Sequence, residues 1–210
     1  SNDLADLIEE EEELEFYTDG SLKRNARGAF GWICTTRDSE NEDEQPKVLL
    51  KGGGRESEFQ EDIVEMNSHK VVKTVAPSST REEAMAMLSM HVAARGLEIS
   101  KRKVGPVNYS DSQSAISTYR SLSKTFPHEL LRKNNADVWQ LIQACGLECG
   151  FFEQKYVPSH MDKFMKFEDL KPEWQGNMLV DKVADEMHYE EDEISAGIWR
   201  HVYLLHSFIR

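Results

Sequence analysis

Four acidic residues and one histidine lie in short polar segments whose chemistry would suit phosphoryl transfer. The acids are Asp19, Glu83, Asp111 and Asp181, and the histidine is His160. Carboxylates that meet in a fold repel one another and are costly to ionise unaided. Divalent cations resolve this conflict, because Mg²⁺ prefers oxygen ligands and is held by few carboxylates plus substrate phosphate. Two such ions roughly 4 Å apart would stabilise the attacking water and the leaving oxygen of an in-line phosphoryl displacement.

Each acid also has an ordinary structural interpretation that is at least as good when the acid is taken singly. Asp19 precedes a glycine, and Asp-Gly is a strong hairpin-turn signal that we favour slightly for this residue alone. Thr80-x-x-Glu83 has the spacing of a capping box. Asp111 could be the N-cap of a helix, and Asp181 could be an exposed helical acid. His160 follows a strand in a loop, where a histidine is commonly structural but could also shuttle protons.

The hydrophobic pattern predicts the elements that must position these residues. Strands are expected at 14–20, 28–35, 47–51, 70–75, 107–110 and 151–157, with 55–69 ambiguous. Three glycines, Gly52 to Gly54, are interpreted as the end of the third strand. Helices are expected at about 80–96, from about 112, and at roughly 134–147, 177–188 and 194–208.

The order of these elements predicts an α/β fold. Strands come first, and helices and strands then alternate, so we expect a mixed sheet in which an antiparallel meander is followed by parallel strands. Asp19 ends the first strand, and Asp111 ends the strand that follows the first helix. If those strands are neighbours, their carboxyl ends converge at the edge where open α/β sheets bind ligands.

Composition narrows the class of protein. The chain has 210 residues, a formal net charge of −13 and three cysteines, which are too few for a disulfide scaffold. No stretch approaches the roughly 18 apolar residues of a membrane helix, and the start of the chain does not resemble a signal peptide. A reduced intracellular protein without a membrane segment is therefore expected. Much of the acidity lies in residues 1–15 and 37–45, which leaves a basic face possible elsewhere.

Taken together, five blocks of sequence resemble type 1 ribonuclease H, especially the ribonuclease H domains of retroelement reverse transcriptases. They occur in the family's order and are Thr18–Ser21 (TDGS), Ser79–Glu83 (STREE), Ser110–Ser114 (SDSQS), Val157–His160 (VPSH) and Gly176–Asp185 (GNMLVDKVAD). The resemblance implies a ribonuclease H-like sheet of five strands flanked by helices. It also implies an endoribonuclease that cuts the RNA strand of RNA–DNA hybrids with two Mg²⁺ ions, for which Mn²⁺ can substitute.

Residue by residue, the resemblance implies distinct roles. Asp19, Glu83, Asp111 and Asp181 would hold the metals, with Glu83 preferred to Glu82 because it lies two positions after Arg81. His160 would assist proton transfer or product release. Four polar residues stand where the family touches the hybrid, namely Ser79, Thr80, Gln113 and Asn177.

Two groups of basic residues are expected to track the phosphates of the substrate. One is Lys23, Arg24 and Arg27, and the other is Lys101, Arg102 and Lys103. Residues 52–72 and 164–175 are longer than the family's usual connections.

We expect three segments, an acidic flexible leader at 1–13, a ribonuclease H-like domain at 14–190 and an amphipathic C-terminal helix at 191–210. The resemblance places the domain in a retroelement polyprotein, with a polymerase domain on the same polypeptide as a partner. Two other functions stay open, a catalytically silent connector or binding domain and a DNA-acting nuclease of the same fold.

Overall fold

The computed structural model describes residues 13–23, 28–37, 45–56, 60–66, 69–75, 77–96 and 106–189. The strands are β1 (Glu13–Leu22), β2 (Gly28–Arg37), β3 (Lys47–Glu56), β4 (Gln60–Met66), β5 (His69–Val75), β6 (Val107–Ser110) and β7 (Glu153–Tyr156). The helices are α1 (Ser79–Gly96), α2 (Gln113–Ser121), α3 (Pro127–Leu130), α4 (Ala136–Cys149) and α5 (Pro172–Met187). Short 3₁₀ turns occupy Leu122–Lys124, Met161–Lys163 and Phe167–Asp169.

The main sheet has five strands in the order β3-β2-β1-β6-β7. β1 pairs antiparallel with β2, and β2 pairs antiparallel with β3, whereas β1, β6 and β7 run parallel to one another. The predicted α/β architecture with a mixed five-stranded sheet is confirmed.

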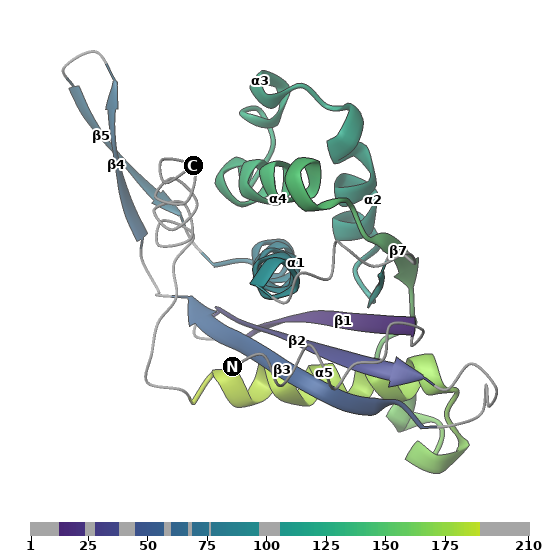
Figure 1. The fold of residues 1–210 in the computed structure, drawn as a ribbon. Coiled ribbons are helices and arrows are strands. Elements are labelled where there is room, and N and C mark those ends of the chain that lie inside the picture. Colours follow the sequence, from purple (N-terminus) through teal and green to yellow (C-terminus); the bar gives the residue numbers. More distant parts are fainter. Residues whose placement is uncertain are drawn as a thin grey trace.

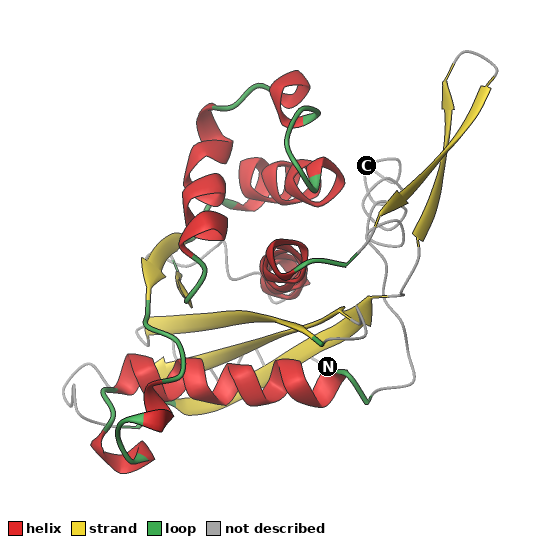
Figure 2. Cartoon of the chain, turned by 180° about the vertical axis from the view of Figure 1, so that it is seen from behind, coloured by secondary structure: helices red, strands yellow, loops and turns green. Residues whose placement is uncertain are grey.

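Helices cover both faces of this sheet, so the molecule has three layers (Figure 1). α1 lies against β1 and β2, and α2 and α4 pack beyond it on the same face. α5 crosses the opposite face under β1, β2 and β3 (Figure 2). Each interface has its own apolar core, the larger one built around Phe16, Trp32 and Trp139 and the smaller one around Tyr17 and Val180.

The three glycines at Gly52 to Gly54 do not end β3, contrary to the sequence prediction. The strand continues to Glu56 and pairs with β2 through this segment. A side chain on Gly52 would begin only 2.7 Å from the indole ring of Trp32 on the neighbouring strand. Glycine is therefore required here by the close approach of an aromatic ring and not by a turn.

Several other boundaries differ from the predictions. β4 was not predicted, and it pairs with β5 as a separate two-stranded sheet that projects from the body in Figure 1. α5 begins at Pro172, five residues before the predicted start, so part of the supposed long connection at 164–175 is helical. The expected leader at 1–13 falls almost entirely outside the described residues, as does the helix at 191–210.

A row of buried polar side chains crosses the three parallel strands. Asn108 on β6 donates from Nδ2 to Thr18 Oγ1 on β1 at 3.0 Å and to Gln154 Oε1 on β7 at 2.8 Å. All three residues are almost completely inaccessible to solvent. The row links the central strands by side-chain bonds in addition to the backbone ladder.

A second buried network joins three elements through charge. The Arg81 guanidinium donates from Nε to both carboxylate oxygens of Glu56 at 2.7 and 2.8 Å, and from its terminal nitrogens to both oxygens of Asp137 at 3.1 and 2.9 Å. Arg81 itself is fully buried. The neighbouring Glu82 also points inward, and burial together with the nearby Glu56 raises its pKa to about 10. The network ties the end of β3 to the first turns of α1 and α4.

His91 makes the fold sensitive to acid. It lies in the core, hydrogen-bonded through Nε2 to Tyr119 Oη at 2.6 Å, and burial lowers its pKa from 6.5 to about 4. The unfolded chain therefore binds a proton near pH 6.5 that the folded chain does not bind until about pH 4, so the contribution of His91 to stability falls as the pH falls through this window. Between pH 7 and pH 4.5 this one residue should cost about 2–3 kcal/mol of unfolding free energy.

Urea unfolding of the wild type and His91→Gln at these two pH values checks the prediction. The variant loses the titrating ring, so the free energy of unfolding of the wild type minus that of the variant should be smaller at pH 4.5 than at pH 7. An equal difference at the two pH values would contradict the assignment.

Candidate active site

Three carboxylates from distant parts of the chain meet at one end of the sheet. Asp19 lies on β1, Glu83 in the second turn of α1, and Asp111 directly after β6. One oxygen from each lies within 4.8 Å of the others. Gly20 permits this approach, because any side chain there would collide with the backbone of Glu83. The fold thus assembles an oxygen-rich group that could hold a metal ion.

The ordinary structural interpretations of these three acids are wrong. Asp19 is paired with Gly31 inside the β1–β2 ladder and not in a turn. Ser78 caps α1, since its Oγ accepts from the backbone N–H of Arg81 at 3.2 Å. Ser112 caps α2, since its Oγ accepts from Ala115 N at 3.4 Å. Neither Glu83 nor Asp111 is needed as a cap.

Asp181 approaches the same group from the opposite face of the sheet. It lies in the middle of α5, because this helix begins five residues before the predicted start at 177. The end of α5 is tied to β1, because Ser21 Oγ donates to Asp185 Oδ1 at 3.0 Å. Asp181 is not one of the three tightly grouped carboxylates, but it lines a pocket with Asp111 and His160.

Burial and mutual repulsion raise the pKa values of all four carboxyl groups. For Asp19 the causes are burial, then the charges of Asp111 and Asp181. For Glu83 they are burial, then Asp19 and Asp111. Burial also raises the pKa of Asp111 and of Asp181, although the nearby His160 opposes the rise in both. Crowded carboxylates that are costly to ionise are a favourable setting for a divalent cation.

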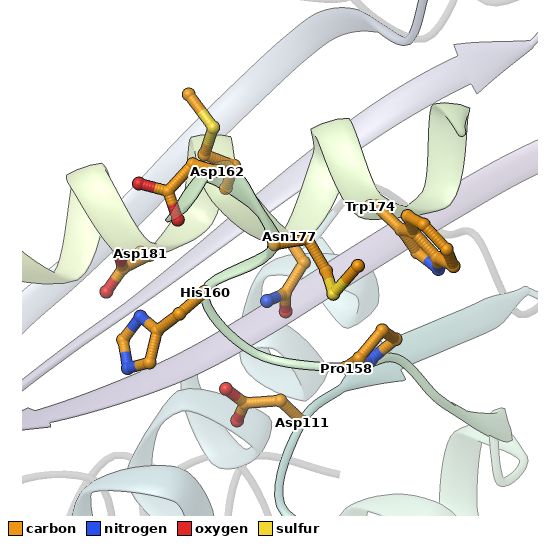
Figure 3. Close-up of a pocket in the computed structure, with 9 residues that line it drawn as sticks. Asp111, Pro158, His160, Asp162, Trp174, Asn177 and Asp181 are labelled. Carbon is orange, nitrogen blue, oxygen red and sulfur yellow. The ribbon is translucent and has the colours of Figure 1, made fainter. Parts of the chain in front are cut away.

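The pocket beside Asp111 contains an amide with an unused acceptor. Figure 3 shows Asn177 pointing from α5 towards the space between Asp111 and His160. Asn177 is buried, and its Oδ1 has no hydrogen-bond partner among the described residues. His160 is exposed on the loop after β7 in a left-handed conformation (φ 55°). Trp174 and Pro158 complete the apolar side of the pocket.

Several solved structures share this arrangement of strands and helices. The N-terminal RNase H domain of a Mycobacterium tuberculosis protein, solved as a fusion with maltose-binding protein, matches with a TM-score of 0.51 and 12% identity over 84% of this chain and 93% of that chain. LC11-RNase H1, solved in complex with an RNA/DNA hybrid, matches with a TM-score of 0.52 and 10% identity over 83% of this chain and 95% of that chain. The chain has a ribonuclease H fold.

A longer viral protein shares the ribonuclease H fold in one part. The prototype foamy virus protease-reverse transcriptase matches with a TM-score of 0.52 and 14% identity, over 88% of this chain but only 22% of that chain. No family model matches the chain, and no curated protein does. None of the described helices is long and apolar enough to cross a membrane.

Within the ribonuclease H fold, the sequence-predicted substrate residues lie on elements that carry or directly follow the carboxylates. Ser79 and Thr80 are exposed in the first turn of α1, and Gln113 is exposed at the start of α2. Asn177 lies inside the pocket. The proposed phosphate-tracking residues Arg24, Arg27, Lys101, Arg102 and Lys103 lie outside the described part of the chain, whereas Lys23 is described and donates to Tyr189 Oη at 3.3 Å.

The sequence did not single out Ser110 as a supporting residue. Its Oγ donates to Glu83 Oε2 at 3.5 Å and accepts from Ser112 N at 3.1 Å. Ser110 thus links Glu83 to the turn that carries Asp111. Its place immediately before an acid at the end of a strand was the available signal.

Proposed function

We propose that this chain is a metal-dependent endoribonuclease that hydrolyses the RNA strand of RNA–DNA hybrids. The observation that supports this most is the meeting of Asp19, Glu83 and Asp111, with oxygens within 4.8 Å, at one end of a ribonuclease H sheet. Asp181 and His160 lie beside this group.

The residues fit a pair of Mg²⁺ ions held by Asp19, Glu83, Asp111 and Asp181, with Mn²⁺ as a substitute. Carboxylate oxygens are the ligands that these hard cations prefer. When bound, the ions would neutralise charge on the phosphate during an in-line displacement. Ser110 Oγ lies 3.5 Å from Glu83 Oε2, and Asn177 would offer an amide to the substrate. His160, on its exposed loop, would carry a proton to or from the leaving group.

The substrate assignment rests on the fold and on chemistry. A relative of this fold was solved in complex with an RNA/DNA hybrid. Ser79, Thr80, Gln113 and Asn177 are hydrogen-bonding side chains that suit recognition of sugar hydroxyls and backbone shape over base sequence. The match to part of a foamy virus protease-reverse transcriptase supports a reverse transcriptase context, with a polymerase domain on the same polypeptide.

Incubating the protein with labelled RNA–DNA hybrid, double-stranded RNA and double-stranded DNA, each with Mg²⁺ or EDTA, tests the proposal. We expect cleavage only of the hybrid, only in its RNA strand and only with Mg²⁺. Cleavage of DNA would favour a DNA-acting nuclease of the same fold. Binding without cleavage under every condition would favour a silent connector or binding domain.

His160→Ala should slow the reaction without abolishing it. If the imidazole transfers protons or speeds product departure, turnover should fall by roughly 10- to 1,000-fold while metal-dependent cleavage survives. Steady-state rates and a titration of Mn²⁺ binding measure the two effects separately. Loss of Mn²⁺ binding would make His160 a ligand and contradict its role as a proton carrier.

A further inference from the structure

A groove runs along α2 and the edge strand β7, next to the carboxylate pocket. It is lined by Gln113, Ser117 and Arg120 from α2, by Tyr156 from β7, and by the buried side chain of Ile116. The three α2 residues follow one another at spacings of four and three, so they share one face of the helix. We call this surface the α2 groove.

Two stretches of chain connect the α2 groove to the carboxylate pocket. Asp111 lines the pocket, and Gln113, two residues later, lines the groove. On the other side, Tyr156 lines the groove, and Pro158, two residues later, lines the pocket. A strand of nucleic acid that reaches Asp111 therefore has the α2 groove directly beside it.

The two surfaces differ in charge. The pocket is lined by Asp111, Asp162 and Asp181, as suits the binding of cations. None of the described side chains that line the α2 groove is acidic, and Arg120 is a cation. The groove therefore suits an anionic backbone that the carboxylates themselves would repel.

The Arg120 side chain is held against β7 by a hydrogen bond. One terminal nitrogen donates to the backbone carbonyl of Gln154 on β7 at 2.6 Å. A guanidinium has five N–H donors, so this bond leaves others to contact a phosphate. Arg120 is exposed, and half of the Tyr156 surface is also accessible.

A neighbouring hollow differs from the groove in charge. It shares Arg120 with the groove but is also lined by Glu153. The Glu153 carboxylate would repel a phosphate there. From Gln113 to Arg120 the helix rises about 10 Å, which sets the length of backbone that the groove can contact.

We propose that the α2 groove binds the sugar–phosphate backbone of the cleaved strand to one side of the scissile phosphate. Arg120 contacts a phosphate, Gln113 and Ser117 contact sugar hydroxyls, and Tyr156 packs against a sugar or base. This inference rests on the proposed function, because it concerns the strand that the carboxylates would cleave.

The test combines a protein variant with a shortened substrate. Binding of a fluorescein-labelled RNA–DNA hybrid to the full chain is measured in Ca²⁺, with the RNA strand shortened one nucleotide at a time from each end. For the wild type, affinity should drop when the nucleotides that reach Arg120 are removed from one side. Arg120→Met should weaken binding of the long hybrid about tenfold, lower the salt slope by about one, and remove the dependence on those nucleotides.

Two controls separate binding from stability. Arg95→Met removes the same side chain at the far end of α1 and should leave affinity unchanged. Tyr156→Ala acts on the same groove without touching the bond between Arg120 and β7, and it should also reduce the length dependence. Thermal unfolding of each variant shows whether β7 has loosened.

The outcomes distinguish this inference from the proposed function. If the wild type cleaves hybrid but Arg120→Met and Tyr156→Ala keep its affinity, salt slope and length dependence, the groove assignment alone is overturned. If the wild type neither binds nor cleaves hybrid, the proposed function and the groove assignment both fail.

Discussion

Asp111→Asn should reduce hybrid cleavage by roughly a thousandfold or more, the equivalent of about 4 kcal/mol of transition-state stabilisation. Asp111 belongs to the group of three carboxylates and also lines the pocket. An amide keeps its shape but removes the charge that a metal needs. Asp19→Asn should have the same effect. Cleavage rates over a range of Mg²⁺ concentrations measure the loss.

The same Asp111→Asn change should not lower the stability of the fold, although it lowers the cleavage rate. Burial raises the pKa of Asp111, and this carboxylate in turn raises the pKa values of Asp19 and Glu83. Without metal, Asp111→Asn relieves that crowding, so its unfolding temperature should equal or exceed that of the wild type. Asp162→Asn, in the same pocket but outside the group of three, is the matched control and should lose less than about tenfold in rate. Near-normal turnover of Asp111→Asn at saturating Mg²⁺ would refute the site.

Arg81→Met should lower the free energy of unfolding by about 3–5 kcal/mol, because it leaves the buried Glu56 and the partly buried Asp137 without their cation. Arg81 is fully buried and binds both Glu56 and Asp137 through paired hydrogen bonds. Arg95→Met is the matched control, since Arg95 pairs with Glu148 where about a quarter of each side chain is exposed. That loss should stay below about 1 kcal/mol. Urea denaturation of the two variants makes the comparison.

A further change tests the cause of that loss. Adding Glu56→Gln to Arg81→Met removes one of the abandoned charges and should restore part of the stability. Equal losses for Arg81→Met and Arg95→Met would show that the buried network contributes no more than a surface pair.

The sheet and the site could be predicted from sequence where local pattern and chain order agree. Alternation of apolar residues identified β1 and β2, and the order of strands and helices identified the mixed sheet. The acids were recognised as a set because the sequence predicted Asp19 and Asp111 at the ends of strands whose carboxyl ends converge. Asp111 does follow β6, whereas Asp19 lies within β1, which continues to Leu22. The structure brings Asp19, Glu83 and Asp111 together as expected.

The wrong sequence predictions come from residue patterns that can arise for two different physical reasons. Glycine marks turns, yet at Gly52 it makes room for the ring of Trp32 on the next strand. Asp-Gly marks hairpins, yet at Gly20 the missing side chain admits the backbone of Glu83. In both cases the deciding contact comes from a segment more than fifteen residues away, which local spacing cannot reveal.

Helix starts were missed for a different reason. Ser78, Ser79 and Thr80 can all cap a helix, and only geometry selects Ser78. Pro172 at the first turn of α5 was an available signal for its early start. The Arg81 network could not be foreseen, because Glu56 and Asp137 lie 25 and 56 residues from Arg81.

The row from Thr18 through Asn108 to Gln154 has a consequence for the accuracy of strand pairing. If β6 slipped by one residue against β1, Asp111 would move by about 3.3 Å and its side chain would turn to the other face. Apolar side chains alone would penalise such a slip weakly, because one branched residue can replace another in a core. A slip would cost more at Asn108, because its amide would lose the hydrogen bonds to Thr18 and Gln154. Each buried polar group left without a partner would cost about 1–3 kcal/mol. Asn108 therefore specifies the register of β6 against β1. This register is the one that brings the carboxylates together.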